Sequence, residues 1–267
     1  LTNNTIERKK LKIVYYIKPV LGEDEVSSNG YIKISYDDNS NIVLAENLYE
    51  PNFKSKIYVT SSEKIKSFTG DKKLFLGKGG LSNPDGLRKV RLNNSSGFGK
   101  QNCIAIHIEV ELESMSSKEI LLNLGASESV LYAKNIAYKY SKISNCRKEN
   151  ENIRKMWKEK LERLQVYTPI ESTNIMLNGW VLYQTITSRL FGRTGFYQSG
   201  GAYGFRDQLQ DTLCLKYINP EMLKNQIIKH SKHQFIEGDV EHWWHEETGR
   251  GIRTKFSDDL LWLVYLT

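Results

Sequence analysis

The sequence is poor in cysteine and proline, with three and five residues respectively among 267, and it has no long apolar run. Cys103, Cys146 and Cys214 stand far apart in unrelated contexts, so neither a zinc site nor a disulfide framework is expected. No stretch approaches the roughly 20 apolar residues of a transmembrane helix, and the first residues lack the apolar core of a secretion signal. The expected location is therefore the cytoplasm or the cytoplasmic face of a membrane.

The charge is not concentrated enough to indicate a nucleic-acid partner, although the formal net charge is +7. The densest charged run, 147–160, mixes both signs, as a solvated helix face does. His242 and His245 flank two tryptophans, but no third ligand is evident, so a structural role is favoured and no metal site is predicted. With 39% hydrophobic and 26% charged residues, the composition is that of a globular protein of one or two domains.

Residues 1–140 are predicted to form a β-sandwich domain. Short segments rich in β-branched and aromatic residues alternate there with turn sequences. The expected strands are 11–17, 30–36, 57–60, 104–112 and 120–125, and the expected turns are 37–40, 69–71, 83–86 and 93–97. The run Gly77-Lys-Gly-Gly80 lacks the spacing of a phosphate-binding loop, so no nucleotide site is assigned to it.

The pattern becomes helical from about residue 141. Apolar residues at helical spacing over 150–164 predict a helical linker spanning 141–168. Residues 169–267 are then expected to hold helices at 174–190, 208–218 and 221–235, with a last helix capped by Ser257. Asp258 and Asp259 would occupy its first turn, where carboxylates favour capping over acid catalysis. Glycine, aromatic, arginine and aspartate residues are concentrated in the loops expected between these helices. Planar aromatic rings stack on pyranose rings, and Arg–Asp neighbours supply donors and acceptors for hydroxyls, so these loops are predicted to bind sugar.

Two such loops carry a specific family resemblance. They are Gly195-Phe-Tyr-Gln-Ser-Gly-Gly-Ala-Tyr-Gly-Phe-Arg-Asp-Gln-Leu-Gln-Asp211, and Glu237-Gly-Asp-Val-Glu-His-Trp-Trp-His245 continuing through Gly249-Arg-Gly-Ile-Arg253 to Trp262. The wording resembles glycoside hydrolase family 94, which contains disaccharide phosphorylases and the C-terminal part of cyclic β-1,2-glucan synthases, and it is most similar to the β-1,2-glucan branch. The resemblance implies a β-sandwich, a helical linker and, over 169–267, the first helices of an incomplete (α/α)6 barrel.

The resemblance also implies a reaction and a set of site residues. Phosphate would attack the anomeric carbon of a β-glucoside while one carboxylic acid protonates the leaving oxygen, with inversion. The implied partners are a β-glucan oligosaccharide, inorganic phosphate as co-substrate and glucose 1-phosphate, with no cofactor. The residues implied to bind substrate are Tyr203, Arg206, Asp207, Gln208, Trp243 and Trp244, and Arg193 is implied to lie near the phosphate. A Gly-Asp-Trp-Asn-Asp-like stretch, which would carry the general acid, is absent, so the acid is expected beyond Thr267 and the isolated chain is expected to be inactive.

Each of these assignments has an alternative. Arg206 and Asp207 could form an ion pair at a helix start, and Trp243 and Trp244 could be packing residues rather than sugar contacts. The chain as a whole could be a carbohydrate-binding or chain-positioning module without chemistry. An incomplete barrel would expose apolar helix faces, which predicts self-association.

Overall fold

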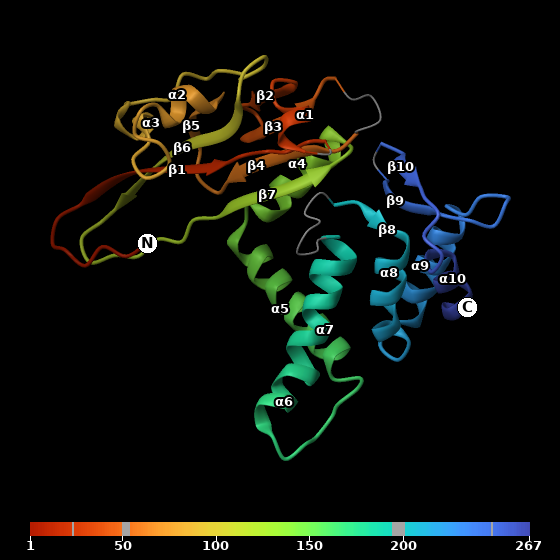
Figure 1. Cartoon of the computed structure of the whole chain (residues 1–267). Helices are drawn as coiled ribbons and strands as arrows, with labels where there is room; N and C mark the ends of the chain where they lie inside the picture. Colours follow the sequence, from red (N-terminus) through yellow and green to blue (C-terminus); the bar gives the residue numbers. More distant parts are fainter. Residues whose placement is uncertain (23, 50–53, 194–200, 247) are drawn as a thin grey trace. The chain divides into compact units, whose positions relative to one another are not determined.

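The computed structural model describes residues 1–22, 24–49, 54–193, 201–246 and 248–267. The chain, drawn in Figure 1, divides into two compact units, residues 1–150 and 151–267. Each unit has its own hydrophobic clusters. Helix α5, Ile143–Leu161, covers much of the predicted linker and runs across the division between the units. The exact domain limits at 140 and 168 stay predictions.

The described residues of unit 1 form two antiparallel sheets, one ordered β1-β6-β5 and the other β2-β3-β4-β7. Their strands are β1 Lys9–Ile17, β2 Ile32–Asp37, β3 Ile42–Asn47, β4 Lys56–Ser61, β5 Ile65–Asp71, β6 Asn102–Leu112 and β7 Leu122–Ser127. Side chains from both sheets meet in one core: Ile32, Ile34, Val43, Ala45 and Val59 pack with Ile104, Ile106, Ile108 and Val110. The predicted sandwich is confirmed. Buried and exposed side chains alternate along its strands, as in β2, where Lys33 is exposed between the buried Ile32 and Ile34.

Unit 1 also contains short helices, although residues 1–140 were predicted to be β structure. They are α1 Glu25–Ser28, α2 Lys72–Leu76, α3 Asp85–Arg88 and α4 Val130–Tyr140. In α4, Ala133 and Ala137 lie one turn apart and pack on Ile42, Leu44 and Tyr58, which point out of the sandwich core. The Ser129 hydroxyl accepts from the Tyr132 amide, so α4 begins with an N-cap that the all-β interpretation missed.

The turn predicted at 69–71 is also wrong, because β5 continues through it. Position 70 has no room for a side chain. A Cβ there would lie 2.6 Å from both the Ile34 side chain and the Ser96 carbonyl oxygen. The Gly70 amide donates to the Ser95 carbonyl at 2.7 Å. The residue therefore marks a close approach of backbone to a strand rather than a reversal of the chain.

Unit 2 is mainly helical, at the places the sequence predicted but with different limits. Its helical elements are α6 Glu171–Ile175, a π-helical stretch Met176–Trp180, α7 Val181–Gln184, a second π-helical stretch Thr185–Phe191, α8 Phe205–Asp211, a 3₁₀ stretch Thr212–Leu215, α9 Pro220–Ser231 and α10 Asp259–Leu266. Helix α9 begins at Pro220 and is capped by Asn219, whose side chain accepts a hydrogen bond from the Met222 amide. No helix in the described part of the chain has the length and apolarity needed to cross a membrane.

A small antiparallel sheet stands where loops were predicted. It has the order β10-β9-β8, from β8 Tyr203–Gly204, β9 Glu241–His245 and β10 Arg250–Arg253. Tyr203 pairs with Trp244 and Gly204 with Trp243. The strands bury aromatic residues against α8 and α10, in a cluster of Tyr203, Phe205, Leu209, Val240, Trp244 and Leu263. The aromatic density that suggested a binding loop thus also builds the core of unit 2.

Candidate functional site

Arg206 and Asp207 lie in the first turn of α8, which begins at Phe205 rather than at Gln208 as predicted. Phe205 and Leu209 are wholly buried and fix this turn on the core. Gln208 is also buried, and its Oε1 accepts a hydrogen bond from the Gly204 amide. Arg206 and Asp207 themselves keep side-chain exposures of 49% and 44%. A rigid helix start therefore presents two adjacent, oppositely charged side chains to solvent.

The described ion pairs give Arg206 and Asp207 different partners, so they do not form the helix-start pair considered from the sequence. The Arg206 guanidinium lies 2.9 Å from the Asp258 carboxylate, just before α10. Asp207 Oδ1 lies 3.8 Å from Arg189 Nη2, at the edge of ion-pair distance. Arg206 is thus held by a remote carboxylate, and the Asp207 carboxylate keeps room for other donors.

Arg189 makes its closer contact with Asp211, at 2.7 Å between Nε and Oδ2. Partial burial raises the pKa of the Asp211 carboxyl, while the Arg189 guanidinium acts in the opposite direction. Arg189 therefore ties the end of the second π-helical stretch to both ends of α8. Nothing in the sequence singled out Arg189, because no spacing rule links it to acids a helix away.

Asp259 and His242 form a second connection to α10. His242 Nδ1 lies 2.6 Å from Asp259 Oδ2, and Asp259 is only 3% exposed. The Phe256 ring stacks on the imidazole at 4.4 Å between centroids. Helix α10 starts at Asp259 and is preceded by Asp258, which makes no side-chain cap, so the predicted Ser257 cap is wrong. Both aspartates serve side-chain partners, a role that the first-turn position did not reveal.

Tyr203 is buried and lies at the centre of an aromatic and cationic cluster. Lys229 Nζ donates to the Tyr203 hydroxyl at 2.9 Å and pairs with Glu246 at 2.8 Å. Burial alone would lower the pKa of Lys229, but these two partners raise it. The guanidinium of Arg193 lies over the Tyr203 ring at 4.7 Å from its centroid. Arg193, the residue implied to be near phosphate, thus lies beside the predicted substrate residue Tyr203.

The two tryptophans have different environments. Trp244 is 1% exposed, with its ring stacked on His233 at 3.8 Å and on Tyr203 at 5.2 Å. Because neighbouring rings cover its faces, the packing alternative describes Trp244. Trp243 is partly exposed and contacts His245 edge-on at 5.7 Å. Of the two, only Trp243 has surface that a sugar ring could contact.

The segment 194–200, which holds Gly195 to Gly200 of the first loop, lies outside the described residues. Within the described residues, no group of His, Cys, Asp or Glu side chains is arranged to hold a metal ion. What the structure brings together is therefore Arg206, Asp207, Asp258, Asp259 and His242 around the starts of α8 and α10.

Comparison with known proteins gives two family matches that together span most of the chain. Residues 1–143 match "Glycosyl hydrolase 94, supersandwich domain", and residues 156–267 match "Glycosyl hydrolase 94 superfamily, catalytic domain". The boundary between the two matches falls within α5.

The proteins and solved structures that are similar to the chain include two enzymes of known name and a phosphorylase structure. It is 28% identical to the cyclic beta-(1,2)-glucan synthase NdvB of Rhizobium meliloti (strain 1021), covering 99% of this chain and 9% of that protein. It is 25% identical to an N,N'-diacetylchitobiose phosphorylase of Vibrio furnissii, covering 90% and 36% respectively. A structure titled "Putative kojibiose phosphorylase from human microbiome" matches with a TM-score of 0.50 and 13% identity, over 92% of this chain and 32% of that one. The chain therefore spans little more than a third, or less, of these relatives.

Proposed function

The chain belongs to the glycosyl hydrolase 94 superfamily, and from this membership we propose that it forms one wall of the sugar site of an enzyme that transfers a glucosyl unit between a β-glucan and phosphate. The relatives named above are phosphorylases and a glucan synthase, which supports this enzyme class. The observation that carries the proposal is the adjacent pair Arg206 and Asp207, half-exposed on a fixed helix start. Such a pair offers the donors and acceptors that sugar hydroxyls need.

The proposed substrate is a β-1,2-linked glucan. The Gly-Phe-Arg-Asp-Gln-Leu-Gln-Asp211 wording is most similar to the β-1,2-glucan branch of the family. The similarity to NdvB, a cyclic beta-(1,2)-glucan synthase, supports the same linkage. Relatives named for chitobiose and for solabiose are 25% and 24% identical, below the 28% of the NdvB match.

Each described residue has a specific place in the proposed reaction. Asp207 accepts hydrogen bonds from hydroxyls of the glucosyl unit that is transferred, and Arg206 donates to the same unit while Asp258 holds its guanidinium. Gln208 maintains the turn before α8, because its side chain accepts a hydrogen bond from the Gly204 amide.

Arg193, beside Tyr203, supplies a planar guanidinium to phosphate. Phosphate attacks the anomeric carbon, and a general acid from outside these residues protonates the leaving oxygen.

The helices of unit 2 are proposed to be the first part of an (α/α)6 barrel. Successive helices along the chain suit that architecture, and unit 2 has them in the 171–191 segment, α8, α9 and α10. Large apolar side chains on the 171–191 segment and on α10 are exposed, including Trp180 at 54% and Val264 at 73%. In a barrel, faces of this kind are covered by the neighbouring helices.

The proposal is tested with the 267-residue protein and sophorose or longer β-1,2-glucans. Calorimetric titration is expected to show binding of the glucan, and Asp207→Asn is expected to weaken it. Asp38→Asn, an exposed aspartate of unit 1, serves as the matched control. Phosphate-dependent release of glucose 1-phosphate is not expected, because the general acid is proposed to lie elsewhere. Absence of glucan binding would contradict the sugar site, and robust turnover would show that the acid lies within these residues.

The same measurements separate a carbohydrate-binding module from an enzyme wall. A module retains its full affinity by itself, and its affinity for glucan is independent of phosphate. An enzyme wall binds glucan weakly alone, and a complete enzyme containing these residues gains phosphate-dependent turnover that Asp207→Asn reduces. The module is favoured if the 267-residue protein binds glucan as tightly as longer forms of the protein do, and if none of those longer forms shows turnover.

A further inference from the structure

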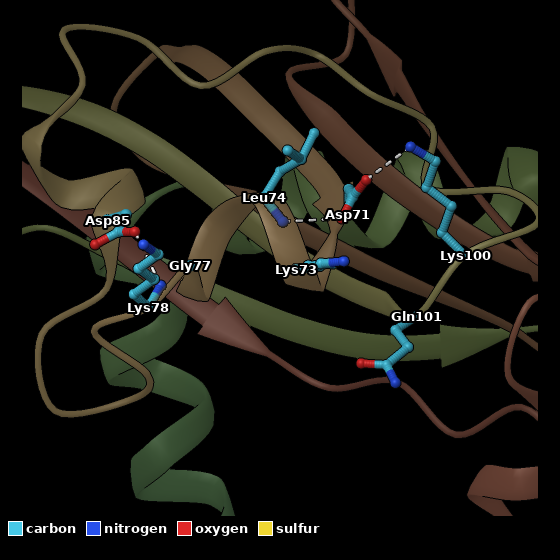
Figure 2. A pocket seen from close by; sticks show the side chains of 8 residues that line it. All are labelled: Asp71, Lys73, Leu74, Gly77, Lys78, Asp85, Lys100 and Gln101. Atoms are coloured by element: carbon cyan, nitrogen blue, oxygen red, sulfur yellow. Dashed lines mark hydrogen bonds and ion pairs between the residues drawn. The ribbon is translucent and has the colours of Figure 1, made fainter.

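A surface hollow of about 1000 Å³ lies on unit 1, where β5 leads into α2 (Figure 2). It lies in the sandwich and shares no residue with the candidate sugar site of unit 2. Its lining consists of Asp71, Lys73, Leu74, Gly77, Lys78, Asp85, Lys100 and Gln101. Among these eight described residues are three lysines and two aspartates, a net charge of +1, and no aromatic side chain.

One of the two carboxylates is fully engaged inside the protein. The Asp71 side chain is 3% exposed, and it accepts from the Leu74 amide at 2.9 Å and pairs with Lys100 Nζ at 3.1 Å. Burial alone would raise the pKa of Asp71, but these partners lower it, so its negative charge is retained and matched by Lys100. Figure 2 shows both contacts at the end of the hollow nearest Lys100. The pair Asp71 and Lys100 therefore adds no free charge to the hollow.

The second carboxylate fixes the glycine-rich turn that follows α2. Asp85 Oδ2 accepts from the Lys78 amide at 3.0 Å. Gly77 has a positive φ of 56°, and a Cβ there would lie 1.9 Å from Asp85 Oδ2. The run Gly77-Lys-Gly-Gly80 is thus a rigid turn held by one carboxylate. It places Lys78 on the rim of the hollow without being a nucleotide-binding loop.

Two cationic side chains remain for a ligand. Within the described part of the chain, no carboxylate lies within 4.0 Å of the Nζ atom of Lys73 or of Lys78. In Figure 2, Lys73 on α2 lies between Lys78 and Lys100. Leu74, 44% exposed, adds an apolar surface beside them. Two lysines on a fixed frame, next to an apolar patch, suit an anion that carries an organic group.

We propose that this hollow binds a dianionic phosphate monoester of about the size of a sugar phosphate. A phosphate monoester carries about −1.5 to −2 charges at pH 7. Its oxygens would meet the ammonium groups of Lys73 and Lys78, in a lining whose net charge is +1. Lysine binds phosphate as a compact point charge. A neutral sugar is poorly suited, because its ring would find no aromatic side chain to stack on. Gln101 provides an amide that can bond to hydroxyl groups of the organic part.

The binding is measured by NMR titration of the intact ¹⁵N-labelled protein, following the amides of Lys78 and Gly79. Three probes are compared: glucose 1-phosphate, inorganic phosphate and glucose. Glucose 1-phosphate is expected to shift these amides, and glucose is not. If inorganic phosphate binds as tightly as glucose 1-phosphate, free phosphate is the source of the bound group; if it binds more weakly, the phosphate monoester is.

Charge-removing variants complete the test. The double variant Lys73→Gln/Lys78→Gln is expected to weaken glucose 1-phosphate binding by about tenfold or more, since it removes two charge-assisted contacts. Lys33→Gln, an exposed lysine of β2 outside the hollow, is expected to leave affinity unchanged. Unchanged affinity in the double variant, or equal shifts with glucose, would overturn the proposal. Shifts at these amides are distinct from any binding at Arg206 and Asp207, so failure here leaves the proposed function of unit 2 intact.

Discussion

Arg206 and Asp258 are joined by a 2.9 Å ion pair that connects the first turn of α8 to the residue before α10. Both side chains are about half exposed, so the pair contributes little to stability, about 0.2–1 kcal/mol. Its main effect is on the direction of the Arg206 guanidinium. Asp258→Asn is therefore expected to raise KM for the glucan several-fold in a complete enzyme, with a small change in the free energy of unfolding. An unchanged KM together with a lower free energy of unfolding would indicate a purely structural pair.

Asp207→Asn tests the sugar contact itself. The substitution keeps the side-chain shape but removes the charge, and a hydrogen bond to a charged group contributes about 1.5–3 kcal/mol. Catalytic efficiency of a complete enzyme is expected to fall roughly 10- to 150-fold, since each 1.36 kcal/mol is a factor of ten. Thermal unfolding should change little, because Asp207 is 44% exposed.

Asp259→Asn is expected to behave differently, because Asp259 is buried and bonded to His242 at 2.6 Å. Weakening a buried, charge-assisted bond should lower the free energy of unfolding by about 1–3 kcal/mol, more than a helix-capping role predicts. Denaturant unfolding of the variant, compared with His242→Gln and with the double variant, gives the coupling between the two residues. Independent, additive effects would mean that the pair does not act as a unit.

His230 predicts a pH dependence of stability. It is fully buried between aromatic rings, and burial lowers its pKa to about 4 from an ordinary value of 6.5. The unfolded chain therefore takes up this proton at a higher pH than the folded one. Stability from neutral His230 is present above pH 6.5 and is lost as the pH falls towards 4, by about 3 kcal/mol. Urea unfolding at several pH values should show this loss, and His230→Gln should flatten it while His245→Gln does not.

Self-association is expected from the exposed apolar side chains of α10. Leu261, Val264 and Tyr265 are 59%, 73% and 70% exposed, and a largely apolar hollow of about 380 Å³ lies beside Trp262. Sedimentation velocity at increasing concentration should show dimers or larger species. The variant Leu261→Gln/Val264→Gln should reduce them, and a monomer at high concentration in the unaltered chain would contradict the expectation.

Much of the sandwich could be predicted, because one face of a strand such as β2 is buried and the other is exposed. Strand β3 escaped prediction because Ile42, Val43, Leu44 and Ala45 are all buried, so no alternation is visible. The cause is α4, which covers the outer face of the sheet at Ile42 and Leu44. A strand buried on both sides gives only a short apolar run, which periodicity cannot assign.

The family motif pointed to Arg206 and Asp207 of the candidate site, but not to the residues that the structure pairs with them. From the sequence, Asp258 and Asp259 are assigned to helix capping because they lie at a helix start. In the structure, Asp258 pairs with Arg206 and Asp259 with His242. Partners far apart in sequence follow no spacing rule. The burial of Trp244 was equally invisible, because a tryptophan on a binding surface and one in a core look alike in sequence.

The small sheet of unit 2 has a consequence for the order of folding. Strands β9 and β10 are neighbours in the chain and close a short hairpin, whereas β8 must cross about forty residues to reach β9. Because a longer loop costs more to close, we expect the hairpin to form before β8 docks onto it. Since α8 follows β8 directly, Arg206 and Asp207 are expected to reach their final positions in that later step. During refolding, the amides of Tyr203 and Gly204 should accordingly become protected from hydrogen exchange later than those of β9 and β10.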